Sequence, residues 1–188
     1  MIVQSHELQL RLAEVNDARR VKEIITPYIE GTSLNLEENV GTLEYYEQLI
    51  LESSSRLPFF VAEFNHEVVG FVYVSELSFM LNLSNTCALS IYVVNDSPVK
   101  GVGYKLLTRL EEALKQAGIH QIIANIVSSN YKSIEFHQRN GFQLLSTFPQ
   151  AGFKFGEWHD VQWYGKKLEV TNQVDTNILD CHLLNLAN

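Results

Sequence analysis

A strand-like run, a glycine turn and a long amphipathic helix together constrain the fold of this chain more than any other feature. Residues 86–94 (TCALSIYVV) are apolar and rich in β-branched and aromatic residues, as in a buried strand. The stretch 95–100 (NDSPVK) has turn composition, and Gly101 and Gly103 lead into a helix predicted over 102–117. Its apolar stripe comprises Val102, Leu106, Leu107, Leu110, Ala113, Leu114 and Ala117. Strand and helix in this order indicate an α/β unit.

The junction between this strand and this helix is a candidate anion-binding site. The first amides of a helix have no intrahelical partners, and the macrodipole adds partial positive charge there. Glycine lets a phosphate approach the backbone closely, and Lys100 supplies a cation beside it. The alternative interpretation is that Gly101 and Gly103 only make a tight turn. The junction is not a dinucleotide fingerprint, because Leu106 stands where a third glycine is needed.

The flanking segments extend a mixed α/β pattern. Residues 7–13 alternate as in a strand, and a helix capped by Asn16 or Asp17 follows, with a kink or early stop predicted at Pro27. Asn65-His66 reads as a hairpin turn, and Gly70 as a bulge or a close backbone approach. Further helices are predicted over 42–51 and 130–139, and further strands over 58–64, 67–74, 121–127, 142–148 and 158–168.

Length and charge restrict the class of protein. The 188 residues suit one domain, which we predict over 1–169, followed by an Asn-rich tail over 170–188 with a short helix at 178–186. A net charge of −8 disfavours a nucleic-acid partner. Two cysteines, the lack of a signal-peptide pattern and the lack of an apolar run of membrane length predict a cytoplasmic protein without a membrane partner.

A second motif carries a specific resemblance. The chain resembles the Gcn5-related N-acetyltransferase (GNAT) superfamily, which binds acetyl-CoA at a strand followed by Arg/Gln-x-x-Gly-x-Gly/Ala and a helix. A later Asn-x-x-Ser helix in that family ends in Gly-Phe. The matching positions are Gly101, Gly103, Asn130, Ser133, Gly141 and Phe142. Within the superfamily, His137 and the segment 148–161 are similar to phosphinothricin and methionine-sulfone acetyltransferases.

The resemblance covers about residues 7–168 and implies a central mixed, mostly antiparallel sheet flanked by helices. It also implies acetyl-CoA as cosubstrate. The acetyl and pantetheine part of acetyl-CoA is expected to contact the backbone of Ile91, Tyr92 and Val93. The pantetheine arm is expected to hydrogen-bond the side chain of Asn130, which belongs to the motif with Ser133. The amides expected to bind its pyrophosphate belong to Val99, Lys100, Gly101, Val102, Gly103 and Tyr104. Pro98 stands where relatives carry Arg or Gln, and Lys100 is expected to compensate.

The catalytic group is less defined. By the resemblance, Ala88 stands where relatives have a proton-accepting Glu, and Leu77-Ser78 where they have a Trp-Arg pair that reads a substrate carboxylate. His137, Glu76 and Tyr131 are therefore the candidates for proton transfer. The alternatives are a packed helix residue for His137 and a solvated loop acid for Glu76. The six histidines show no ligand spacing, so no metal is expected.

Together these features predict an N-acetyltransferase that moves an acetyl group from acetyl-CoA to the primary amine of a small molecule. One alternative is an acyl-CoA-binding sensor or subunit of the same fold with weak catalysis. A protein N-terminal acetyltransferase is a further alternative, and it would need a groove for a peptide. By analogy with relatives, a homodimer that contacts through residues 152–160 is expected.

Overall fold

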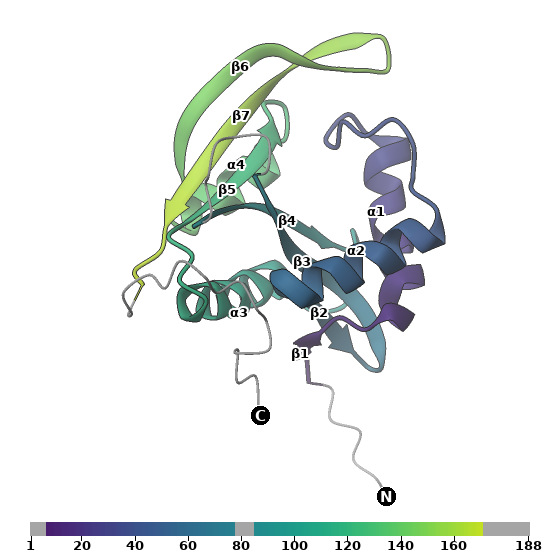
Figure 1. The fold of residues 1–188 in the computed structure, drawn as a ribbon. Helices are drawn as coiled ribbons and strands as arrows, with labels where there is room; N and C mark the ends of the chain where they lie inside the picture. The colour runs from purple at the N-terminus through teal and green to yellow at the C-terminus, as the bar shows by residue number, and fades with distance from the viewer. Residues whose placement is uncertain (1–6, 78–84, 171–188) are drawn as a thin grey trace, which may run out of the picture.

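The structure is a computed structural model and describes residues 7–77 and 85–170 of the chain (Figure 1). Its described part contains a seven-stranded sheet in the order β1-β2-β3-β4-β5-β7-β6. The strands are β1 Gln9–Leu12, β2 Phe59–Phe64, β3 Glu67–Glu76, β4 Thr86–Val93, β5 Gln121–Val127, β6 Gln143–Lys154 and β7 Glu157–Lys167. Neighbouring strands are antiparallel except β4 and β5, which are parallel. The predicted mixed, mostly antiparallel sheet is confirmed.

Helices cover both faces of this sheet (Figure 1). The helices α1 Ala18–Gly31 and α2 Leu43–Arg56 pack on one face, against Phe59, Val61 and Phe71. The helices α3 Val102–Gln116 and α4 Tyr131–Arg139 pack on the other, where Phe60 and Val72 belong to the core. Because successive strand residues point to opposite faces, β2 and β3 are apolar at nearly every position. No helix in the described ranges is long and apolar enough to cross a membrane.

Three segments differ from the sequence predictions. Pro27 does not end its helix, which continues to Gly31; Pro27 is exposed, so water can reach the carbonyl that loses its donor. The second helix continues past the predicted end at 51, to Arg56. The strand predicted over 142–148 extends to Lys154 through a register shift between Phe148 and Gly152, because an edge strand tolerates proline and bulges. The predicted tail lies outside the described residues, apart from Val170.

The hairpin between β2 and β3 confirms both expectations for its turn and its glycine. Asn65 and His66 have φ of 52° and 64°, the left-handed conformation of a tight hairpin turn. The register shifts where Ala62 pairs with Gly70 and Glu63 pairs with Val68, so Val69 is left over as in a bulge beside Gly70. A Cβ on Gly70 would lie 3.0 Å from the Tyr92 carbonyl oxygen and 3.1 Å from Val102 Cγ1. Gly70 thus lets β3, β4 and the start of α3 pack closely.

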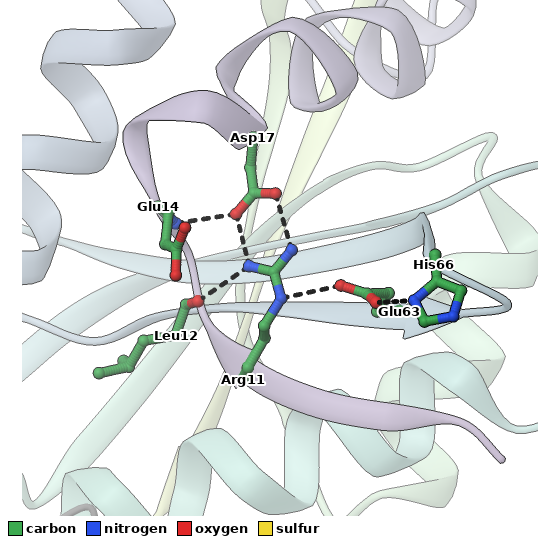
Figure 2. Close-up of polar contacts among 6 residues, drawn as sticks. All are labelled: Arg11, Leu12, Glu14, Asp17, Glu63 and His66. Atoms are coloured by element: carbon green, nitrogen blue, oxygen red, sulfur yellow. Dashed lines mark hydrogen bonds and ion pairs between the residues drawn. The ribbon is translucent and has the colours of Figure 1, made fainter. Parts of the chain in front are cut away.

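Arg11 ties β1 to β2 and to the start of α1 (Figure 2). Its Nη1 and Nη2 donate to the Asp17 carboxylate at 2.7 and 2.9 Å, and its Nε donates to Glu63 Oε2 at 2.9 Å. Asp17 also accepts from the Glu14 amide at 2.8 Å. Burial raises the pKa of Asp17, but the hydrogen bonds from Arg11 and Glu14 outweigh it and leave the pKa below its ordinary value.

Asp17→Asn should therefore lower the free energy of unfolding by about 2 kcal/mol, because it weakens a half-buried charge-assisted pair. Since the native pKa of Asp17 is depressed, its contribution is present above the unfolded pKa and lost as pH falls through the folded pKa. Urea unfolding at several pH values measures both effects. The matched control is Glu135→Gln, which removes an exposed ion pair with Arg139. Equal unfolding midpoints for the two variants would contradict the prediction.

Candidate functional site

The parallel strands β4 and β5 part within the sheet, and the candidate site lies where they separate (Figure 1). They are paired at Thr86, Cys87 and Ala88, whereas β4 remains paired with β3 as far as Val93. Because the Val94 amide donates to β3 at 2.9 Å, alternation directs the amides of Ile91 and Val93 toward the side that β5 has left. This opening therefore presents backbone N–H donors to a ligand.

The α1 side of the opening is lined by polar aromatic side chains. The Tyr28 hydroxyl donates to the Val93 carbonyl at 2.6 Å, and its ring meets the Tyr92 ring edge-on at 5.3 Å. Asn35, in the α1–α2 connection, donates from Nδ2 to the Tyr92 hydroxyl at 3.0 Å. Tyr73 lies opposite Ser90 in the register of β3 and β4. Burial raises the pKa of Tyr73 to about 12, so its hydroxyl stays protonated.

The glycine turn leads into α3 as the sequence predicts. Gly101 has φ of 78° and is the N-cap of α3, and the first helical hydrogen bond runs from the Lys105 amide to the Gly101 carbonyl at 3.0 Å. The preceding amides of Val102, Gly103 and Tyr104 therefore have no acceptor within the helix. A Cβ on Gly103 would lie 3.4 Å from the Phe136 ring, so this position of α3 packs directly beside α4.

The remaining turn residues differ in exposure and in whether their backbone amides are already hydrogen-bonded. Lys100 and Tyr104 are exposed. The Val99 amide lies 3.3 Å from Ser97 Oγ, which in turn donates to the Val99 carbonyl at 2.8 Å. The Val99 amide is thus already engaged inside the turn, while the amides at the start of α3 are the ones available to an anion.

The helix α4 begins at the predicted Asn-x-x-Ser motif. Asn130 is its N-cap, and its Oδ1 accepts a hydrogen bond from the Ser133 backbone amide at 3.1 Å. This leaves the side-chain Nδ2 of Asn130 as a donor. His137 Nδ1 lies 2.8 Å from the Ser133 carbonyl oxygen, so Nδ1 carries the proton of the neutral ring. Burial lowers the pKa of His137, although the Ser133 carbonyl acts in the opposite direction.

The His137 ring is packed edge-on between Phe136 and Phe142, at centroid distances of 5.2 and 4.9 Å. Its Nε2 is buried and has no hydrogen-bond partner among the described residues. A neutral imidazole with an unpaired Nε2 is a proton acceptor. The other two proton-transfer candidates lie apart from it along the chain: Tyr131 opens α4 with 76% of its surface exposed, and Glu76 ends β3 opposite Cys87.

Two further expectations concern thiols and metals. Cys87 is buried in the core, and burial raises the pKa of its thiol, in agreement with a packed cysteine. Among residues 7–77 and 85–170, three or more His, Cys, Asp or Glu side chains do not gather in a way that could hold a metal ion.

The β6–β7 hairpin arches over the sheet so that its tip lies near the α1–α2 connection (Figure 1), and its anchoring there was not predicted from the sequence. From this tip Lys154 donates to backbone carbonyls of Ile29, Asn35 and Glu37. The site residues Tyr28, Asn35, Tyr73 and Lys154 were not identified either. Of the contacts that these residues make, only the pairing of Tyr73 with Ser90 could have been found from the sequence, through the alternation of the predicted strands. The other contacts join segments that lie far apart in the sequence.

Comparison with known proteins identifies the family of the chain. The acetyltransferase (GNAT) domain family matches residues 10–163. The L-amino acid N-acyltransferase MnaT of Escherichia coli K12 is 34% identical over 118 residues, which are 63% of this chain and 69% of the relative. A phosphinothricin N-acetyltransferase of Streptomyces viridochromogenes is 26% identical over 87% of this chain and 89% of its own.

A solved structure shares the fold. The putative acetyltransferase yncA of Salmonella typhimurium, solved with its cofactor acetyl-CoA, superposes with a TM-score of 0.82 and 27% identity, over 90% of this chain and 98% of that one.

Proposed function

Because the chain belongs to the GNAT acetyltransferase family, we propose that it transfers the acetyl group of acetyl-CoA to the primary amine of a small molecule. The observation that carries this proposal is the parting of β4 and β5 beside the free amides of α3. The relatives act on amino-acid-like amines, as their names L-amino acid N-acyltransferase and phosphinothricin N-acetyltransferase state.

The proposed cosubstrate site has two parts. The pyrophosphate of acetyl-CoA is held by the amides of the first turn of α3, which have no acceptor within the helix, with Lys100 as a nearby cation. Its arm lies between the parted strands, along the backbone of Ile91, Tyr92 and Val93 and beside Asn130 and Ser133. This division fits the net charge of −8, because backbone donors bind phosphate where the overall charge repels it.

In the proposed reaction the amine nitrogen attacks the thioester carbonyl carbon. The new C–N bond forms as the C–S bond breaks, and the proton that the amine loses goes at the end to the thiolate of coenzyme A. An amide of Ile91 or Val93 polarises the carbonyl oxygen. The proton passes through one of the three candidates, of which His137, with its unpaired Nε2, has the geometry of an acceptor.

Thiol release from acetyl-CoA, measured across a panel of primary amines, tests this function. We expect amine-dependent release and a product whose mass is that of the amine plus one acetyl group. The alternative function, an acyl-CoA sensor, is favoured by one observation: Ala88, the last residue before the strands part, has no proton-accepting side chain. Tight binding of acetyl-CoA with no release of thiol for any amine would overturn the proposed enzymatic function and support a role as a sensor.

Gly103→Glu should weaken acetyl-CoA binding at least about tenfold, because it adds negative charge and bulk at the amides that would hold the pyrophosphate. Isothermal titration measures the dissociation constant, on protein whose circular dichroism shows that it folds. Gln116→Glu is the matched control, since it makes the same charge change at the exposed far end of α3. Unchanged affinity in Gly103→Glu would remove this turn from the cosubstrate site.

His137→Ala should lower kcat by a factor on the order of 10² with little change in acetyl-CoA affinity, because general acid–base groups contribute that much. A base must be unprotonated, and burial lowers the pKa of His137. The acidic limb of the wild-type rate profile should therefore fall below the ordinary histidine pKa of 6.5, and the variant should lose that limb. The exposed neighbour gives the control Gln138→Ala. A normal kcat in His137→Ala would show that His137 only packs in the core.

We also propose that the protein is a homodimer and is located in the cytoplasm. Six large apolar side chains are exposed on the β6–β7 hairpin: Leu144, Leu145, Phe148, Phe153, Phe155 and Trp158. Exposed apolar side chains of this number on one hairpin favour contact with a second copy of the chain. The free thiol of Cys87 is consistent with a reducing compartment.

A further inference from the structure

The wall of the opening on the α1 side carries two tyrosine hydroxyls, those of Tyr28 and Tyr92, whose hydrogen-bonding capacity is only partly used. A phenolic hydroxyl has one donor and two acceptor lone pairs. The partner that each hydroxyl already has therefore decides what it can still offer. Both residues are half-buried rather than enclosed in the core.

The Tyr28 hydroxyl can offer only its lone pairs. It donates its proton to the Val93 carbonyl oxygen at 2.6 Å, and a carbonyl has no proton to give back. Within residues 7–77 and 85–170, Tyr28 Oη accepts no hydrogen bond. The carbonyl and the amide of Val93 lie on the same edge of β4, so Tyr28 Oη stands at the opening, beside the proposed thioester site.

The Tyr92 hydroxyl has the opposite polarity. Asn35 Oδ1 accepts from the Glu37 backbone amide at 2.7 Å, which fixes Asn35 Nδ2 as the group that faces Tyr92. That Nδ2 donates to Tyr92 Oη at 3.0 Å, and the Tyr92 proton has no acceptor in the described part of the chain. Burial raises the pKa of Tyr92, so the proton stays on the hydroxyl as a donor.

The β6–β7 hairpin holds this arrangement in place. Lys154 donates from Nζ to the carbonyl oxygens of Asn35 and Glu37, each at 2.7 Å, so the backbone on both sides of the Asn35 amide contact is anchored. The rings of Tyr28 and Tyr92 meet edge-on, with centroids 5.3 Å apart. The wall thus presents an acceptor and a donor on neighbouring rings.

We propose, on the basis of the proposed acetyl transfer, that these two hydroxyls bind the acceptor molecule. Tyr28 Oη accepts an N–H of the amine, and Tyr92 donates to an oxygen atom elsewhere in the same molecule. A neutral primary amine has two N–H donors and one lone pair, so an N–H held by Tyr28 leaves the lone pair for the thioester carbon. The acceptor is therefore a primary amine that carries a carbonyl, sulfonyl or carboxylate oxygen within reach of Tyr92.

A pair of amines of similar shape separates the two contacts: 3-(methylsulfonyl)propan-1-amine and 4,4-dimethylpentan-1-amine, in which tert-butyl replaces methylsulfonyl. The ratio of their kcat/KM values is compared between variant and wild type, so that the different basicity of the two amines cancels. Tyr92→Phe should reduce this ratio at least about fivefold, because only the sulfone offers an oxygen to the lost donor. A hydroxyl that merely supported the fold would lower both values alike.

Tyr28→Phe should lower kcat/KM about fivefold for both amines and leave their ratio unchanged, because the amine group is common to both. The dissociation constant of acetyl-CoA should stay at the wild-type value. A hydroxyl that only fixed the end of β4 would change that constant, since the strand is the proposed support of the cosubstrate.

Asn35→Asp inverts the polarity of the contact with Tyr92. At about pH 8 an aspartate is ionised and only accepts, so it takes the Tyr92 proton while it still accepts from the Glu37 amide. The ratio of the two amines should fall as far as in Tyr92→Phe. Asn39→Asp is the matched control, because it makes the same charge change at an exposed position of the same connection, and its ratio should stay at the wild-type value.

An unchanged ratio in Tyr92→Phe or Asn35→Asp would overturn the assignment to Tyr92, and weaker acetyl-CoA binding in Tyr28→Phe would overturn the assignment to Tyr28. A protein that acetylates other amines of the panel but neither probe would overturn the two-hydroxyl site and leave acetyl transfer intact. Acetyl-CoA binding without turnover of any amine would overturn the proposed function itself.

Discussion

The loss of one hydrogen-bonding neighbour along β4 is the constraint on which the site depends. Backbone N–H and C=O groups inside a protein need partners, and beyond Ala88 the strand has β3 on one side only. The Tyr28 hydroxyl satisfies the Val93 carbonyl, while the outward amides of β4 have no strand to pair with. Donors left without a strand partner in the middle of a sheet are available to a ligand, and helices cover both faces of the sheet around them.

The close contacts of glycine maintain this geometry. Gly70 brings β3 against the Tyr92 carbonyl and Val102, and Gly103 brings α3 against Phe136 of α4. A Cβ at Gly70 would crowd the Tyr92 carbonyl and Val102, whereas a Cβ at Gly103 would just touch the Phe136 ring. The anion-binding end of α3 and the opening in the sheet are therefore set at a fixed distance by packing rather than by charge, which suits a chain with a net charge of −8.

Local periodicity made most of the fold predictable from sequence, and the family resemblance supplied the expectation for the cosubstrate half of the site. The apolar stripe of α3, the turn at Asn65-His66 and the Asn130 cap depend on residues within one or two turns of each other, and all are present in the structure. The contacts on the α1 side of the opening were missed because they include pairs such as Lys154 and Ile29, which lie 125 positions apart. A lysine in an exposed-looking strand carries no sign that three carbonyls surround it.

The anchoring of the α1–α2 connection by Lys154 has a thermodynamic consequence. The same residues that shape the wall beside Tyr92 also seat the tip of the hairpin, so the two cannot rearrange independently. If a molecule on the hairpin and the acceptor both distinguish the seated from the unseated position, the factor by which the first changes acceptor affinity equals the factor by which the acceptor changes the affinity of the first. The proposed dimer contact and the proposed acceptor site would then be thermodynamically linked through the anchoring by Lys154.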